Sequence, residues 1–330
     1  MKRVLSAVLG LLFTALAAQA QVQVDSVFFD GRASIQASVG PGSQYDLNLI
    51  GEALNLNLWG HLSPSVSYRF RQRFNMPLYD PDNPLNATDW LLISWKATPR
   101  WTFNAGKMPT FIGGYEWDYA PVDLHFWSDF DNSVGQYYAL GGAVFYTAAP
   151  GQQIQLQVTR SLLSYGQSNV WSAALGWYGS IAPWWKTIWA FTFMDDPYRH
   201  RMSYTTLGNR FEAGPLALEL DFMYRRALLP VGGMGPDLTF TGHLWWYIGN
   251  FHLFAKGGYD YNDAANVDGN GVPYDLSVAP GTRYAFAGGG VEYFPLGNRD
   301  IRIHAVGWWN NRTNSLTLNA GVTFRLYIVR

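Results

Sequence analysis

Apolar and polar residues alternate along most of the chain. In residues 65–75 the odd-numbered positions are polar or cationic, and the even-numbered positions are apolar except for Gln72. Similar alternation recurs in residues 153–159, 216–225 and 316–326. A period of two residues is that of a β-strand with one polar and one apolar face, because successive side chains of a strand point to opposite sides. The pattern therefore predicts an all-β protein.

The alternating segments predict sixteen strands, which is an even number. They cover residues 30–40, 45–60, 65–76, 87–97, 100–110, 136–148, 152–162, 168–181, 184–195, 200–213, 215–228, 236–248, 251–262, 281–295, 299–310 and 314–328. Links after even strands are tight, such as 150–151, whereas the long links 77–85, 111–135, 229–235 and 263–280 all follow odd strands. A transmembrane barrel segregates short turns and long loops in this way, and a soluble β-sandwich has no reason to do so. The predicted fold class is an all-β transmembrane antiparallel β-barrel of about 16 strands.

The composition agrees with a surface that is partly covered by lipid. Of the 330 residues, 48% are hydrophobic and only 14% are charged, whereas soluble domains carry roughly 25% charged residues. After residue 20 no apolar run reaches the roughly 18 residues of a transmembrane helix, so membrane insertion would require a closed barrel. Aromatic residues gather near the predicted tight turns, which favours an aromatic girdle over core packing. They are Trp59, Trp95, Trp101, Phe145, Tyr146, Trp177, Tyr178, Trp184, Trp185, Trp246, Tyr247, Phe251, Tyr293 and Phe294.

The same composition excludes several functional classes. With 23 basic and 24 acidic residues the net charge is −1, which gives no general attraction to the phosphates of nucleic acid. The absence of cysteine excludes disulfides, thiolate metal sites and a cysteine nucleophile. No metalloprotease or phosphate-binding motif occurs and the six histidines are scattered, so we predict no enzyme, no cofactor and no metal. A membrane hydrolase with serine and histidine on adjacent strands is the enzymatic alternative.

The first residues have the pattern of a secretory signal peptide. Lys2 and Arg3 precede a short apolar stretch, and Ala18-Gln19-Ala20 offers the small residues of a cleavage site. We therefore predict a signal peptide at 1–20 and a single mature domain, the barrel, at 21–330, with a net charge near −3. Export of a barrel would place it in the outer membrane of a Gram-negative cell, where lipid is its first partner.

Two segments carry a family resemblance. The strand 56–60, the turn 61–64 and the strand 66–71 (Val-Ser-Tyr-Arg-Phe-Arg) together resemble the second and third strands of the phosphate-selective porin O and P family. Gly106-Lys107-Met108-Pro109, followed closely by Phe111, Gly113 and Glu116, is similar to that family's segment at the entry to its third loop.

The resemblance is specific for about residues 45–120 and implies a sixteen-stranded diffusion channel, usually a homotrimer, whose third loop folds inward. The chain is short for that family, and it ends in Arg330 rather than in the customary aromatic residue, although Tyr327 is near. No run of lysines or further arginine ladder occurs in the third loop, so phosphate selectivity is not carried over.

The long link 111–135 is the best candidate for a functional element. Its 25 residues interleave acidic and aromatic side chains, and a loop exposed to water would rarely be so aromatic. We expect it to fold into the barrel, with its aromatic side chains on the inner wall and its carboxylates toward the pore. A loop that packs on itself outside the barrel is the alternative. The candidate acidic residues are Glu116, Asp118, Asp123, Asp129 and Asp131.

Arg69, Arg71 and Arg73 are spaced by two, which puts all three on one face of a strand, and their aromatic neighbours suit lipid. Three cations about 7 Å apart repel one another, so an acidic partner is expected. We expect the third-loop carboxylates to face this row and to form a pore constriction that sets ion preference. The alternative pairs the arginines with Glu52 or with other acids of the wall. A second wall cluster has weaker claims and consists of Glu219, Asp221 and Arg225.

The leading functional hypothesis is passive diffusion of small polar solutes or ions through a water-filled barrel narrowed by the link 111–135. The rival, from another class, is a non-conducting barrel that serves as an adhesin or an assembly scaffold. The arginine row favours anions, whereas the loop acids and the negative mature charge favour cations. The sequence does not decide the sign of the selectivity.

Overall fold

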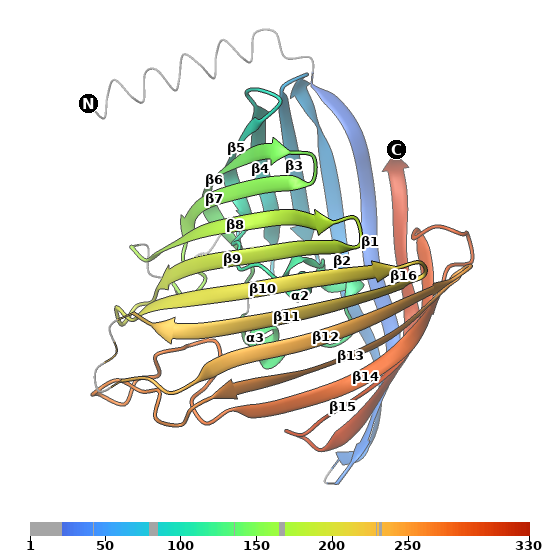
Figure 1. The fold of residues 1–330 in the computed structure, drawn as a ribbon. Coiled ribbons are helices and arrows are strands. Elements are labelled where there is room, and N and C mark those ends of the chain that lie inside the picture. The colour runs from blue at the N-terminus through green and yellow to red at the C-terminus, as the bar shows by residue number, and fades with distance from the viewer. Residues whose placement is uncertain are drawn as a thin grey trace.

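The computed structural model describes residues 22–41, 43–78, 85–134, 136–164, 169–228, 230 and 233–330, with only the backbone described at 43–46. Sixteen antiparallel strands form one closed barrel, in which each strand pairs with the next and the last pairs with the first. Figure 1 shows the first and last strands side by side where the barrel closes. The predicted signal peptide, 1–20, lies outside the described residues.

All sixteen predicted strands are present, so the fold prediction is confirmed. The strands are β1 Gln23–Gly40, β2 Ser43–Ser63, β3 Val66–Arg73, β4 Thr88–Lys96, β5 Trp101–Pro109, β6 Tyr138–Ala149, β7 Gln152–Arg160, β8 Trp171–Ala182, β9 Trp185–Asp195, β10 Arg201–Ala213, β11 Leu216–Ala227, β12 Asp237–Ile248, β13 Phe251–Asn262, β14 Arg283–Tyr293, β15 Ile301–Asn310 and β16 Ser315–Val329. The largest difference is at β1, which begins at Gln23 rather than at residue 30. Its first residues already pair with the end of β2, where Gln23 lies opposite His61.

The two faces of the wall follow the alternation in the sequence. On β1, Arg32 and Ser34 point to the inside and are buried, whereas Ala33 and Ile35, at the alternate positions, are exposed on the outside. Leu49 on β2 is 84% exposed. A soluble protein would not leave a whole wall of such side chains in water, and a membrane barrel covers them with lipid.

The predicted girdle is correct for only part of its members. Trp95, Trp101 and Trp184 are exposed on the outer face near the tight turns. Trp59 instead packs edge-on against Phe28, with ring centroids 5.1 Å apart. Four more of the predicted members have contacts on the inner face, because their position in the strand has the other parity. They are Phe145, Tyr178, Tyr247 and Phe294.

The four longest connections follow odd strands as predicted, but three other links after odd strands are short. Residues 41–42 join β1 to β2, residues 196–200 join β9 to β10, and residues 311–314 join β15 to β16, so these links are no longer than the link 294–300 after β14. Gly214 and Gly249 occupy tight turns at φ values of 59° and 55°, a conformation that favours glycine because it has no Cβ. We call the end of the barrel with the tight turns the turn end, and the other end the loop end.

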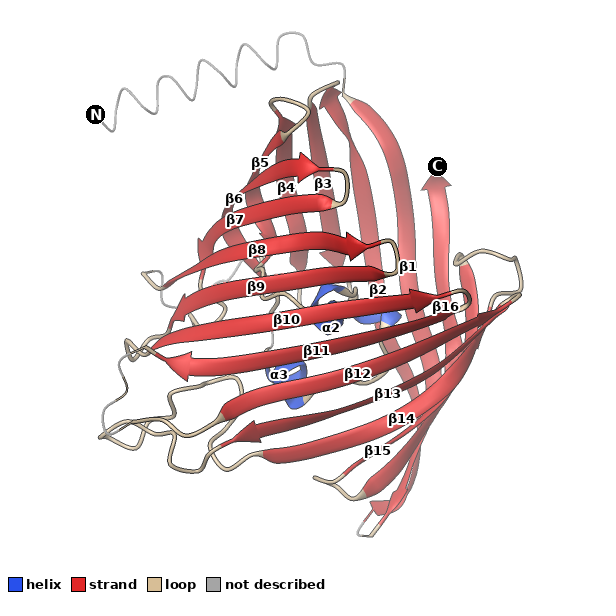
Figure 2. Cartoon of the chain, viewed as in Figure 1, coloured by secondary structure: helices blue, strands red, loops and turns tan. Residues whose placement is uncertain are grey.

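The connection from β5 to β6 contains the helical elements. They are the helix α2 Tyr115–Asp118, the 3₁₀ turn η1 Pro121–Asp123 and the helix α3 Asp129–Ser133. Figure 2 draws α2 and α3 in blue within the outline of the barrel. Among the described residues, no helix is both long enough and apolar enough to cross a bilayer.

Three apolar clusters join this connection to the wall. The first surrounds Phe130, Tyr204 and Val278, and so combines α3, β10 and the link between β13 and β14. The second places Phe126 against Trp245 and Phe254, on β12 and β13. The third places Phe111 against Ala174 on β8 and Ile188 on β9. The apolar packing of the connection therefore runs along the wall from β8 to β13.

Candidate functional site

Residues 110–137, which we call the β5–β6 segment, contact inner-face side chains all around the barrel. Two aspartates of the wall bind the first turns of its helices. Asp221 on β11 accepts hydrogen bonds from the backbone N–H groups of Tyr115 and Glu116, at 2.9 and 2.8 Å. Asp260 on β13 accepts one from Asp129 N–H at 2.8 Å. The first N–H groups of a helix have no partner within the helix, so these carboxylates act as caps that come from another part of the chain.

Cations of the wall bind backbone carbonyl groups of the same segment. Lys256 Nζ on β13 donates to the Phe126 carbonyl at 2.7 Å. Arg32 on β1 donates to the Leu124 carbonyl at 2.6 Å. These two contacts tie Leu124 and Phe126, in the stretch between η1 and α3, to strands on different sides of the point where the barrel closes.

Three of the five predicted loop acids bind cations of the second half of the barrel. Glu116 forms an ion pair with Lys256 at 2.6 Å. Asp123 pairs with Arg302 on β15 at 2.7 Å. Asp129 pairs with Arg312 in the link after β15, also at 2.7 Å. Among the described residues, none of these three carboxylates forms an ion pair with the arginine row of β3, because the apolar clusters hold the segment against the opposite wall. That the loop acids and the row form one constriction stays a prediction.

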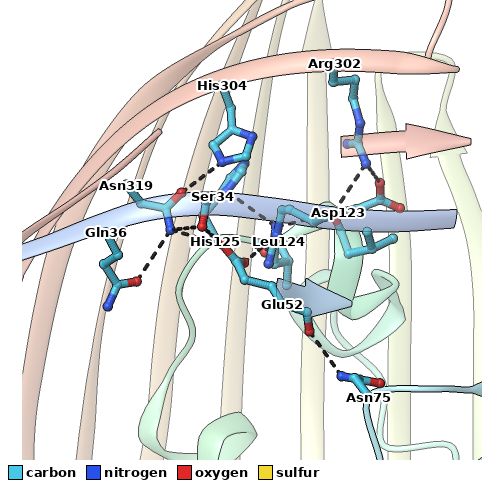
Figure 3. Close-up of polar contacts among 12 residues, drawn as sticks. Ser34, Gln36, Glu52, Asn75, Asp123, Leu124, His125, Arg302, His304 and Asn319 are labelled. Carbon is cyan, nitrogen blue, oxygen red and sulfur yellow. Dashed lines mark hydrogen bonds and ion pairs between the residues drawn. The ribbon is translucent and has the colours of Figure 1, made fainter. Parts of the chain in front are cut away.

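Figure 3 shows how Asp123, Leu124 and His125 lie between β1 and β15. His125 Nε2 is 3.2 Å from Glu292 on β14, and its ring centroid is 4.6 Å from that of His304. Burial lowers the pKa of His125 below its ordinary value. The imidazole is therefore neutral at pH 7, so it adds no cation to this part of the site.

The other two loop acids differ in their surroundings. Asp118 is exposed and accepts a hydrogen bond from the Tyr178 hydroxyl on β8, at 3.2 Å. Asp131 is buried, and no lysine or arginine of the described chain forms an ion pair with it. Burial, and then the neighbouring carboxylate of Glu116, raises the pKa of Asp131 well above its ordinary value. Burial also raises the pKa of Asp118, but less than that of Asp131, because the Tyr178 hydroxyl stabilises the Asp118 carboxylate and its side chain reaches open space. Asp118 therefore keeps more of its charge at the site than Asp131.

The acidic residue that pairs with the arginine row of β3 lies on the next strand. Asp89 on β4 lies 3.4 Å from Arg71 Nε and 2.9 Å from Arg73 Nε. Glu52 is not their partner, because it binds Arg32 at 2.5 Å. Arg69 stacks on Trp90 with 4.1 Å between the guanidinium carbon and the ring centroid, and within the described residues it has no ion pair. Pairing with an acid of the wall, the alternative interpretation of the row, therefore holds for two of the three arginines.

Two cavities lie between the arginine row and the β5–β6 segment. The first has a volume of about 410 Å³ and is bordered by Arg69 and Arg71 on the wall and by Glu116, Asp118 and Asp131 of the segment. The second has a volume of about 430 Å³ and is bordered by Arg71, Arg73 and Asp89, together with Arg32 and Glu52. The arginine row and part of the predicted acids therefore border the same space, although they form no ion pairs with one another. Asp123 and Asp129 border neither cavity.

The two cavities succeed each other along the barrel axis. The first extends to Gln153 and Tyr178, near the turn end of β7 and β8. The second extends to Gln36 and Asn75, near the loop end of β1 and just beyond β3. A shared set of residues borders both cavities and marks the place where they meet. It consists of Arg71, Pro121, Trp127, Tyr137 and Tyr138.

The second predicted wall cluster has a structural role. Arg225 is fully buried and lies 2.7 Å from Asp237 and 2.9 Å from Asp275. Glu219 accepts a hydrogen bond from the Tyr119 hydroxyl at 2.6 Å. Sequence reasoning missed the wall residues that hold the segment, above all Asp260 and Lys256. Their only signal in the sequence was a charged side chain at an inward position of a strand.

Comparison with known proteins gives the fold and no closer relationship. No known sequence family and no curated protein matches the chain. Among solved structures, Salmonella typhi OmpF in complex with daunomycin is 9% identical, with a TM-score of 0.61, and the match covers 93% of this chain and 98% of that one. Vibrio cholerae OmpT in a trimer form is 10% identical, with a TM-score of 0.57 over 92% of this chain and 100% of that one. A variant of the Rh. blastica porin is 15% identical, with a TM-score of 0.54 over 91% and 99%.

These likenesses show that the chain has the fold of the porin structures, a closed sixteen-stranded barrel. The narrower resemblance to the phosphate-selective porin O and P family stays a prediction, as does the homotrimer that it implies.

Proposed function

We propose that the protein is an outer-membrane porin, through which small polar solutes and ions diffuse passively, and that the β5–β6 segment lies in the lumen and narrows it. The observation that carries this proposal is the pair of cavities that succeed each other from the loop end toward the turn end. A barrel built as a scaffold or an adhesin needs no such passage. The apolar outer wall supports a location in lipid, with a homotrimer as the expected assembly.

The charges that border the cavities favour anions. Arg71 and Arg73 share one carboxylate, that of Asp89, and Arg69 adds a cation that has no ion pair among the described residues. Of the acids on the segment, Glu116 is compensated by Lys256 of the wall, burial raises the pKa of Asp131, and Asp118 remains. Positive side chains are therefore in excess around the cavities, so we propose a modest preference for anions.

Planar-bilayer recordings of the purified protein test the proposed function. We expect steady conductance in KCl, together with a gel band that shifts on boiling, as expected of an intact barrel. A folded, heat-modifiable barrel that stays silent in the bilayer would instead support the scaffold or adhesin. Recovery as a soluble periplasmic monomer would contradict the membrane location.

Single neutralisations of two loop acids should differ sharply in effect. Asp118→Asn removes a charge at the first cavity and should move the reversal potential in a KCl gradient toward anions. Asp131→Asn should move it less at pH 7, because burial and the neighbouring carboxylate of Glu116 raise the pKa of that carboxyl well above its ordinary value. Equal shifts in the two variants would show that Asp131 is charged and would contradict this account of the site.

A further inference from the structure

The first cavity has the lining of a ligand pocket rather than that of a simple aqueous channel. Nine aromatic side chains border it, together with three glutamines and two arginines. Its volume of about 410 Å³ falls within the range of roughly 300–1,000 Å³ that is common for small-molecule sites. Passing hydrated ions needs no aromatic lining, so this composition points to a solute that makes contact with the wall.

Trp127 offers an open ring face at the place where the two cavities meet. Its indole makes no ring stacking and donates no hydrogen bond to any described part of the chain, and it is only partly buried. Trp117, on the same segment, is different. Its Nε1 donates to the Thr110 carbonyl at 2.8 Å, and its ring packs on Tyr137 with centroids 4.6 Å apart. Trp127 therefore has an unused flat surface in the passage.

Arg69 offers a positioned cation that forms no ion pair among the described residues, although the carboxylate of Asp30 on β1 is near enough to interact with its charge. The guanidinium is held over the Trp90 ring at 4.1 Å, and its buried Nε has no acceptor among the described residues. Arg71 and Arg73, by contrast, are held by Asp89. A planar guanidinium can bind a carboxylate through two parallel hydrogen bonds, so Arg69 fits a carboxylate ligand.

Gln155 adds a neutral polar group to the same cavity. The side-chain amide of its neighbour Gln157 is fully used, because it accepts from Phe111 N–H at 2.6 Å and donates to the Pro109 carbonyl at 2.9 Å. Gln155 borders the cavity, and its amide makes no hydrogen bond within the described structure. It can therefore bind a hydroxyl substituent of a ligand.

We propose that the first cavity is a binding site for small organic carboxylates that carry a flat ring. The carboxylate binds Arg69, the ring lies against Trp127, and Gln155 binds a hydroxyl group on the ring. Three acids border the same cavity, and each has a partner or is buried: Glu116 pairs with Lys256, Asp118 accepts a hydrogen bond from Tyr178 on β8, and Asp131 is buried. The inference rests on the proposed function, because it makes this class of solute a preferred cargo of the channel.

Isothermal titration of the detergent-solubilised protein with 4-hydroxybenzoate tests the site without a membrane. We expect saturable binding, with acetate, which lacks the ring, and phenol, which lacks the charge, each weaker by about tenfold or more. Arg69→Gln and Trp127→Ala should each weaken the binding of 4-hydroxybenzoate to a similar extent. Arg226→Gln, at an exposed position on the outer face of β11, is the matched control and should bind normally. Equal binding of 4-hydroxybenzoate, acetate and phenol to the wild type would overturn the proposal even if a variant failed to fold.

Bilayer recordings with 4-hydroxybenzoate distinguish a failure of the binding site from a failure of the proposed porin function. We expect 4-hydroxybenzoate to reduce the KCl current, with half-inhibition near the dissociation constant from titration. A conducting barrel that shows no saturable binding of 4-hydroxybenzoate would overturn the site and leave the porin function standing. Binding with the expected ring and charge dependence in a barrel that never conducts would support the pocket and contradict the porin.

Discussion

Replacing Arg69, Arg71 and Arg73 together with alanine should move the reversal potential in a low-salt KCl gradient from anion to cation preference. The change removes three positive charges that border the cavities and leaves Asp89 without its two partners. A buried carboxylate and the exposed Asp118 would then dominate the field in the passage. The shift should fade above about 1 M salt, where the screening length falls to roughly 3 Å.

The loss of both ion-pair partners of Asp89 requires a control for stability. Loss of one partner from a buried ion pair costs about 3–5 kcal/mol, so the triple variant must be checked for a normal heat-modifiable band. Arg69→Ala alone removes no ion-pair partner from an acid among the described residues. It should shift the reversal potential in the same direction by less. If Arg69→Ala and the folded triple variant both keep the wild-type reversal potential at low salt, the row does not border the conducting path.

Replacing Asp221 and Asp260 together with alanine should release the β5–β6 segment and increase the single-channel conductance. The two carboxylates accept hydrogen bonds from N–H groups at the first turns of α2 and α3. A buried donor that loses its acceptor costs about 1–3 kcal/mol, so the loss summed over these groups competes with the packing that holds the segment. The measurement is single-channel current in KCl, together with the rate of proteolysis within the segment in detergent.

The double asparagine variant is the matched control for this release. Asparagine keeps one acceptor oxygen in the place of each carboxylate, so we expect conductance between the wild-type and the alanine values. Wild-type conductance and protease resistance in the alanine variant would show that the apolar contacts of Phe126 and Phe130 hold the segment without these caps.

The site was predictable from the sequence only in its parts. The inward direction of Arg69, Arg71 and Arg73 follows from their spacing, and the importance of the link 111–135 follows from its length and its aromatic residues. The cations that bind Glu116, Asp123 and Asp129 were not predicted. Asp89 lies only 16 residues beyond Arg73, but its position next to the row depends on a register irregularity between β3 and β4 at Arg71 and Gln72.

Alternation by itself determined the sixteen strands and the face on which nearly every side chain lies, because the two-residue period is a local property of an extended backbone. Only the tertiary structure decided which charges meet. Glu116 forms an ion pair with Lys256, and Asp123 forms one with Arg302. They do so because closure of the barrel and the apolar packing of Phe126 bring residues that are far apart in the sequence to one wall. No local pattern encodes such distances, since an ion pair across the barrel depends on the register of every strand between its members.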